Sequence, residues 1–231
     1  RHRQAEATAR QALVEARTKL VNTVRSFMRT KALPRVKGTP DSLAKNMRRA
    51  LQHLGVSLPN HVERLLCTIE GLNESIDEAD KALKQIAEQD PVCKLLQTMP
   101  GVCPVTAVCF ATAIDDPQRF ESADKVTSYL GLTPGENTTG FKTKRTGVTK
   151  AGSSRVRWTL NQAAWTMTRC RPNDPIVQWF KQVAGRRGKK IAITALSRKM
   201  AGILYAMWRD QKSYNPAKAV QDQPLPQELT T

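Results

Sequence analysis

Apolar positions recur at helical spacing along most of the chain. Between residues 1 and 31, Leu13, Leu20, Val24 and Phe27 recur at steps of three, four or seven, and no glycine or proline interrupts them. This pattern predicts one long amphipathic helix. Arginines occupy many of the other positions, so two interpretations stay open: a solvated basic face, or a face that contacts nucleic acid.

The segment 61–90 carries apolar residues at steps that alternate between three and four without a slip. Such a pattern predicts the seam of a coiled coil, with the apolar residues at the a and d positions of the heptad. The partner could be a second chain or another helix of the same chain, and the sequence leaves both open. The predicted seam residues are Val62, Leu65, Ile69, Leu72, Ile76, Ala79, Leu83 and Ile86.

After Pro91 the chain becomes more apolar. Residues 95–114 predict a short helix, a Pro-Gly turn and a second helix, with Gly101 at the bend. This is typical of a helix-hairpin-helix, whose backbone amides can meet a DNA phosphate, or of a plain αα-hairpin in a core. Further helices are predicted from Ser122, Gly152 and Asp174 onwards and over 189–212, and a short loop or small hairpin over 132–150.

The expected fold is therefore mainly α, with long helices and a coiled coil followed by a compact helical domain. We divide the chain into four segments. They are a basic helical connector (1–58), a coiled-coil helix (59–90), a C-terminal helical domain (91–212) and a polar, proline-containing tail expected to be disordered (213–231).

The net charge of the chain indicates which class of partner it binds. The 37 lysines and arginines exceed the 20 acids and give a formal net charge of +17. Such an excess favours a polyanion, with nucleic acid the first candidate and an anionic membrane surface the second. No apolar run reaches the length of a membrane span, and we expect no membrane partner. The five cysteines form no CxxC pair, which argues against zinc and favours a reducing compartment, the cytoplasm.

The stretch GENTTGFKTKRTGVTKAGSSRVRWTL (135–160) combines two threonines, a glycine and many cations, with no acid between Glu136 and Asp174. Cations concentrated on a loop and on the helix start after it are suited to phosphate contacts. A second basic cluster precedes the last helix. The candidate nucleic-acid-binding residues are Lys142, Lys144, Arg145, Lys150, Arg155, Arg157, Arg186, Arg187, Lys189 and Lys190.

Several ordered motifs resemble one family. They are the PG hairpin of PGVCPVTAVCFATAI, the RF pair (119–120), YLGLTP (129–134), TTG (138–140) and TKAG (149–152), followed by an arginine-rich helix start. Together they resemble the transposases of insertion-sequence family 110, grouped with families 116, 902 and 1111. The resemblance covers roughly residues 90–210, and the preceding helices are similar to the family's connecting helices and coiled coil.

The resemblance implies DNA transposition by site-specific recombination, guided by a structured RNA. It also implies a RuvC-like half with a DEDD carboxylate set that binds Mg²⁺, and this half would precede Arg1. The family's nucleophilic serine before a glycine corresponds here to Thr139, with Thr138 beside it. The N-capping role is the expected one for Ser153 and Ser154, so neither replaces that serine.

We therefore expect a truncated transposase that binds DNA and guide RNA and associates with itself through the coiled coil. No metal or cofactor is expected in this chain, and we expect it to be inactive alone and associated with a bacterial nucleoid. The alternative is a non-catalytic basic protein that binds nucleic acid. A basic membrane-surface protein would fit the charge but not the family-like motifs.

Overall fold

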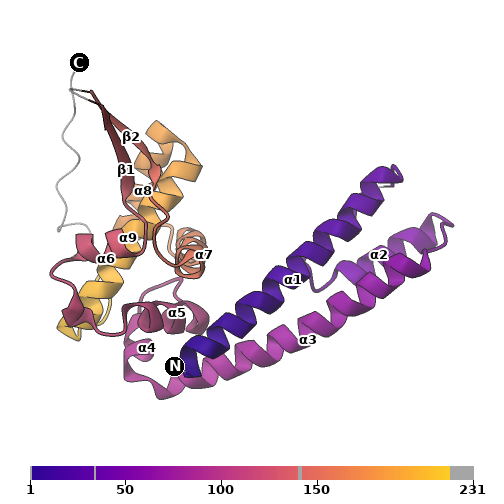
Figure 1. Cartoon of the computed structure of the whole chain (residues 1–231), viewed down its shortest axis with the longest axis horizontal. Coiled ribbons are helices and arrows are strands. Elements are labelled where there is room, and N and C mark those ends of the chain that lie inside the picture. Colours follow the sequence, from indigo (N-terminus) through magenta and orange to yellow (C-terminus); the bar gives the residue numbers. More distant parts are fainter. Residues whose placement is uncertain (1, 34, 140–141, 219–231) are drawn as a thin grey trace. The chain divides into compact units, whose positions relative to one another are not determined.

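The computed structural model describes residues 2–33, 35–139 and 142–218. These residues form nine α-helices, one 3₁₀ turn and one two-stranded hairpin, so the expected mainly α fold is confirmed (Figure 1). None of the helices in these ranges combines the length and the apolar character that a membrane crossing requires. The elements are α1 (His2–Thr30), α2 (Leu43–His53), α3 (Asn60–Gln89), α4 (Pro91–Leu96), α5 (Pro104–Ile114), η1 (Pro117–Arg119), α6 (Ala123–Tyr129), β1 (Pro134–Thr139), β2 (Lys142–Val148), α7 (Ser154–Cys170), α8 (Pro175–Arg187) and α9 (Lys189–Asp210).

The chain divides into two compact units, Arg1–Lys84 and Gln85–Thr231. In the first unit, α1 and α3 pair antiparallel. Arg10 Nε donates to Asp80 Oδ1 over 2.8 Å, and Arg17 donates to Asn73 Oδ1 over 2.9 Å. The second pair lies one heptad later on α1 and one heptad earlier on α3, so both pairs belong to a single register. The segments expected to be a connector and a coiled-coil helix therefore pack on each other within one chain.

The buried stripe of α3 differs in phase from the predicted seam. Val62, Ile69, Ile76 and Leu83 are buried as predicted. The alternate positions of the predicted seam are only half-buried. Of the residues one position later, Leu66 and Ala87 are buried, whereas Asn73 and Asp80 are half-buried and pair with arginines of α1. We call the half-buried alternate positions the outer stripe: Leu65, Leu72, Ala79 and Ile86. The observed seam of α3 is Val62, Leu66, Ile69, Asn73, Ile76, Asp80, Leu83 and Ala87.

The matching stripe of α1 also holds polar residues. Arg10 and Arg17 stand at seam positions, between Ala7, Val21 and Val24, which are all buried. The side chains of Arg10 and Arg17 are only 14% and 15% exposed, because the partner helix covers them. Asp80 and Asn73 supply acceptors to these guanidiniums, and Asp41 supplies a second one to Arg17, whose buried Nε has no partner in the described residues. The polar seam positions of the two helices thus pair with each other.

Helix α2 completes the core of the first unit. It buries Leu43, Met47 and Leu51 against the α1–α3 pair. On its outer side, Arg48 donates to the carboxylates of Glu63 and Glu70 on α3, at 2.6–3.0 Å for the shortest bonds. The hydrogen bonds from Arg48 hold the pKa of both carboxyls below the ordinary value of 4.5.

The second unit is assembled around α9. This helix packs against α4, α6, α7 and α8, and most of its length is buried. Near its C-terminal end, the hydroxyl of Tyr205 donates to the carbonyl of Phe120 over 2.6 Å. The neighbouring Arg119 donates to the carbonyl of Ile114. The Arg-Phe pair seen in the sequence therefore ties the segment between α5 and α6 to the central helix.

The turn between α4 and α5 lies in this core. Gly101 has a φ of +87°, and a side chain there would collide with the backbone of α7 at Ala163 and Met167. Met99 and Val102, on either side of the turn, are buried. Gly101 therefore faces α7 rather than a ligand, and the geometry supports the plain αα-hairpin over the helix-hairpin-helix.

The first residues after α9 are held by specific contacts. The backbone N–H of Tyr214 donates to the hydroxyl of Thr98, and its phenol donates to the carboxylate of Asp174 over 3.0 Å. Asp174 also caps α8 by accepting from the N–H of Ile176. Residues 213–218, expected to belong to a disordered tail, thus fold back onto the second unit. Residues 219–231 lie outside the described residues.

The two possible seams of α3 predict different costs for shortening a side chain. Replacing the buried Ile69 with alanine leaves a cavity and should lower the free energy of unfolding by about 2–5 kcal/mol. Replacing Leu72, on the outer stripe, should cost roughly 1 kcal/mol or less, since less apolar area is lost. Urea unfolding followed by circular dichroism measures both. An equal loss in the two variants would show that the seam containing Leu72 is the buried one.

Candidate nucleic-acid interface

The threonines and several cations predicted to form the site lie on the hairpin. Strands β1 and β2 pair antiparallel, with Thr138 opposite Thr143 and Thr139 opposite Lys142. The predicted small hairpin is thus present, and both threonines stand at its far end. The tip, residues 140–141, lies outside the described residues. So do the side chains of residues 136–145, which include the candidates Lys142, Lys144 and Arg145.

The base of the hairpin is fixed by a close backbone crossing. Its ladder continues below the strands, where Thr149 N–H donates to Thr133 O and Lys150 N–H donates to Gly131 O. Gly131 has a φ of +67°, and a side chain on Gly152 would overlap the carbonyl of Tyr129. The YLG and TKAG motifs are therefore in contact, and they need glycine where their backbones touch. We call residues 129–133 and 149–152 the hairpin clamp.

Arg157 reinforces the hairpin clamp from α7. Its guanidinium donates to the carbonyl oxygen of Leu130 over 3.2 Å and to that of Gly152. Ser153 caps the same helix, as predicted, by accepting from the N–H of Val156. One arginine thus joins both sides of the clamp to the start of α7. These bonds give Arg157 a structural role, and its contact with nucleic acid stays a prediction.

Exposed cationic and aromatic side chains surround the clamp. Lys150 is exposed, with a φ of +57° imposed by the crossing, and Arg155 lies half-buried on the first turn of α7. Tyr129 and Trp158 are 48% and 43% exposed, which is unusual for side chains of this size. The Tyr129 ring packs against Phe120, with 5.2 Å between the ring centroids. Exposed cations and aromatic side chains are the combination that binds a nucleic-acid strand, by phosphate contacts and base stacking. Neither aromatic belongs to the site predicted from the sequence, although Tyr129 begins the YLGLTP motif and Trp158 follows a predicted arginine.

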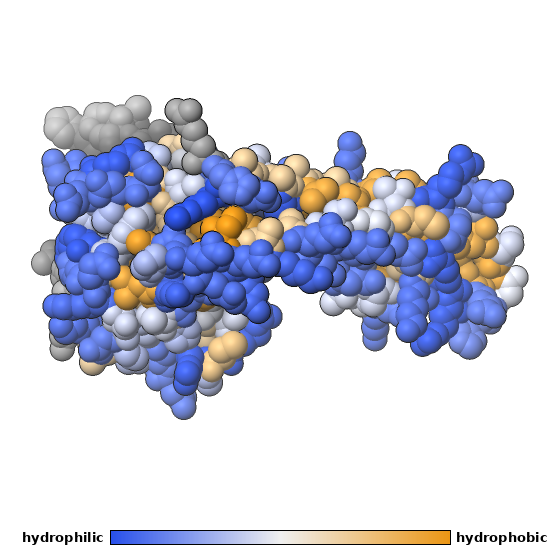
Figure 2. Space-filling model, turned by 90° about the horizontal axis from the view of Figure 1, so that it is seen from below, coloured by the Kyte–Doolittle hydropathy of each residue, from blue (hydrophilic) through white to orange (hydrophobic). Residues whose placement is uncertain are grey.

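The second basic cluster forms an exposed turn between α8 and α9. Arg186 and Arg187 end α8, and Lys189 and Lys190 begin α9, with Gly188 at a φ of +81° between them. All four cations are exposed, and so is Ile191. We call these four cations the basic turn. Hydrophilic residues cover most of the face shown in Figure 2, and hydrophobic patches lie between them.

The acids of the described residues form no candidate metal centre. No group of three or more histidine, cysteine, aspartate or glutamate side chains that could hold an ion occurs among them. The adjacent Asp115 and Asp116 serve the chain turn, because Asp116 accepts from the N–H of Gln118 and Asp115 ends α5 with a φ of +65°. No three-ligand set that would hold Mg²⁺ thus occurs among the described residues.

Comparison with known proteins finds a family match within the second unit. Residues 93–176, which run from α4 into α8 and include the hairpin clamp, match the model of the Transposase IS116/IS110/IS902 family. This segment of the chain is therefore similar to the domain that these transposases share. The resemblance found from the PG, RF, YLGLTP and TKAG motifs is thus confirmed.

Curated relatives extend the similarity beyond the matched domain. The chain is 29% identical to the transposase for insertion sequence element IS1111A of Coxiella burnetii, over 91% of the chain and 59% of that protein. It is 37% identical to the putative transposase y4qE of Sinorhizobium fredii, over 52% of the chain and 37% of that protein. The transposase for IS1328 of Yersinia enterocolitica is 28% identical, over 86% and 60%. The chain thus spans about half the length of these relatives.

The hairpin clamp depends on glycine at its crossing. Gly152→Ala places a methyl group against the Tyr129 carbonyl, so the strands must separate, and we expect a loss of roughly 2 kcal/mol in the free energy of unfolding. Gly185→Ala is the control, because nothing lies within 4 Å of that position on α8. It should stabilise the protein by up to about 1 kcal/mol. Thermal unfolding of both variants checks this, and an unchanged Gly152→Ala would show that the crossing is looser than described.

Proposed function

We propose that the chain supplies the coiled-coil region and the C-terminal domain of an insertion-sequence transposase, and that it binds DNA and a structured guide RNA. The family match over residues 93–176 carries the proposal. It is supported by the exposed cations and aromatics around the hairpin clamp and by the basic turn. In a bacterial cell such a protein would associate with the nucleoid.

The full reaction would be strand transfer through a protein–DNA intermediate. We propose Thr139 as the nucleophile, with Thr138 beside it, because the two stand where the family resemblance expects a serine before Gly140. An alcohol attacks a phosphodiester only when a base or metal takes its proton and cations hold the developing charge. The lysines of β2 and the cations of the clamp would provide the charge. Carboxylates that bind Mg²⁺ in a RuvC-like region would provide the activation.

The alternative is a non-catalytic protein that binds nucleic acid. The residue at the expected nucleophile position favours it, because threonine adds a methyl group to the carbon that carries the attacking hydroxyl. No histidine follows His61 in the sequence, so a neighbouring imidazole base is also missing. In this case the clamp and the basic turn would keep their contacts with phosphate, and no covalent step would occur.

We also propose that two copies associate through the outer stripe. Leu65, Leu72, Ala79 and Ile86 repeat every seven residues and are half-buried, although Leu65 also packs against the core of the first unit. A stripe with this period suits the same stripe of a second α3, since both have the same heptad spacing. Light scattering of Leu72→Asp should then show a smaller species whose helical content is retained.

Binding should be steeply dependent on salt. The affinity of the chain for a DNA duplex should fall roughly a thousandfold between about 50 and 200 mM salt if several phosphates are contacted. Arg186→Gln/Arg187→Gln should lower the slope of log affinity against log salt by about 1–2. Arg64→Gln/Lys81→Gln removes the same charge from the acid-rich α3 and should leave the slope unchanged. Fluorescence anisotropy measures all three proteins, and a flat salt response would remove the nucleic-acid function.

If Thr139 is the nucleophile, we can predict under which conditions a covalent protein–DNA adduct forms. The chain alone, incubated with Mg²⁺, supercoiled plasmid and RNA, should neither nick DNA nor form an adduct, because loss of a general base alone costs about a hundred- to ten-thousandfold in rate. Addition of the RuvC-like region should restore an adduct, and Thr139→Ser should form it faster. Thr139→Ala should form none. An adduct that persists in Thr139→Ala would assign the nucleophile to another residue.

A further inference from the structure

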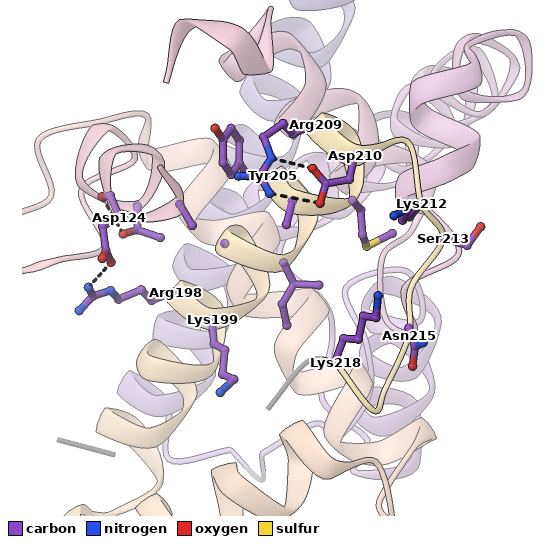
Figure 3. Close-up of a pocket in the computed structure, with 16 residues that line it drawn as sticks. Asp124, Arg198, Lys199, Tyr205, Arg209, Asp210, Lys212, Ser213, Asn215 and Lys218 are labelled. Carbon is purple, nitrogen blue, oxygen red and sulfur yellow. Dashed lines mark hydrogen bonds and ion pairs between the residues drawn. The ribbon is translucent and has the colours of Figure 1, made fainter. Parts of the chain in front are cut away.

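A pocket of about 470 Å³ lies in the second unit, and none of its lining residues belongs to the hairpin clamp. It is lined by α6, by the C-terminal half of α9 and by the segment that folds back after α9. Figure 3 shows Asp124 and Arg198 on one side and Lys212, Asn215 and Lys218 on the other, with α9 between them. The matched family domain ends at residue 176, so most of this pocket lies beyond it.

Five cations and two acids line this pocket, and both acids already have partners. Arg198 lies 3.0 Å from Asp124, and Arg209 lies 2.7 Å from Asp210 (Figure 3). The carboxyl of Asp210 has a lowered pKa, caused first by the hydrogen bond from Arg209 and further by the charges of Lys212 and Lys218. The acids therefore neutralise the arginines, and the net positive charge of the pocket comes from lysines.

Lys212 and Lys218 carry the charge that remains available. Both are exposed, and neither ammonium group makes a hydrogen bond or ion pair with another described residue. The third lysine, Lys199, lies with its ammonium group 4.9 Å from the centre of the Trp179 ring. Two ammonium groups at one side of a partly enclosed pocket attract an anion more strongly than the same groups on an open surface.

A buried donor in the pocket wall also lacks an acceptor. The Nε of Arg198 is buried and has no hydrogen-bond partner in the described residues, although one terminal nitrogen of the same guanidinium donates to Asp124. An unsatisfied guanidinium N–H is an uncommon and costly feature in a folded protein. Figure 3 shows this guanidinium directed towards Asp124 and away from Lys212 and Lys218, so it is not part of the site at the two lysines.

We propose that this pocket binds a phosphate-bearing nucleotide unit, with its phosphate at Lys212 and Lys218. A volume of about 470 Å³ exceeds that of a phosphate alone and accommodates a sugar and base as well. Asn215 offers an amide beside the two lysines. The unit belongs to a nucleic-acid strand, so the inference rests on the proposed function and adds to it a site outside the clamp and the basic turn.

The experiment compares two double charge reversals. Lys212→Glu/Lys218→Glu changes the pocket, and Lys94→Glu/Lys125→Glu makes the same change in net charge at two exposed lysines that do not line it. The probes are fluorescein-labelled oligodeoxythymidylate of about ten nucleotides, a length within the usual range of single-strand sites, unlabelled adenosine monophosphate as competitor and inorganic phosphate. The pocket variant should weaken oligonucleotide binding by about tenfold or more, and the control by less than about threefold. Lys212→Arg/Lys218→Arg should retain binding, and circular dichroism verifies that all variants fold.

The possible outcomes distinguish a failure of the pocket assignment from a failure of the proposed nucleic-acid binding. If the oligonucleotide binds the wild type and both charge reversals weaken it equally, the pocket assignment fails while the nucleic-acid function stands. If adenosine monophosphate binds and is lost only in the pocket variant, but the oligonucleotide does not bind, the pocket holds free nucleotide and the proposed function fails. Phosphate that competes as well as either nucleotide probe would overturn a nucleotide site, and no binding of any probe would overturn both proposals.

Discussion

The backbone contact between Gly131 and Gly152 is the constraint on which the candidate interface depends. Two segments about twenty residues apart approach until no side chain fits between them. This contact brings the two ends of the hairpin together and sets the start of α7, through Arg157, at the same point. The position of Thr139, at the far end of the hairpin, follows from this base. A fold commonly presents chemical groups to a large substrate in this way, on a loop or hairpin held by a rigid base.

The helices could be predicted from the sequence, but the way they pair could not. The periodic pattern over 61–90 correctly indicated the buried Val62, Ile69, Ile76 and Leu83, but it could not show that Asn73 and Asp80 pair with α1. Asn73 and Asp80 became acceptable seam residues only because Arg17 and Arg10 lie opposite, more than fifty residues earlier in the chain. A polar residue in a helix cannot be recognised as buried until its partner is known, and a local pattern does not contain that information.

In the candidate site, too, local features could be predicted from the sequence and contacts between distant residues could not. Caps at Ser122, Ser153 and Asp174 were predictable because a cap is a local interaction. The αα-hairpin at Gly101 could not be told from a DNA-binding motif, because the two differ only in what covers the turn, and α7 covers it from about sixty residues away. The lysines of the pocket were missed for a related reason. A polar, proline-containing composition predicted disorder, whereas one residue, Tyr214, provides the contacts that hold the segment in place.

The polar pairs in the seam of α1 and α3 also determine which alignments the two helices can adopt. If α1 slid by one heptad, one arginine could still meet Asn73 or Asp80. The other arginine would then lie against Leu66 or Ala87, where no acceptor is available, and a buried guanidinium without a partner is strongly unfavourable. A purely apolar seam would tolerate the same slip at little cost. The two arginines thus make the hairpin of helices selective for its own register, and they would equally disfavour exchange of α1 with an unrelated coiled coil in a crowded cell.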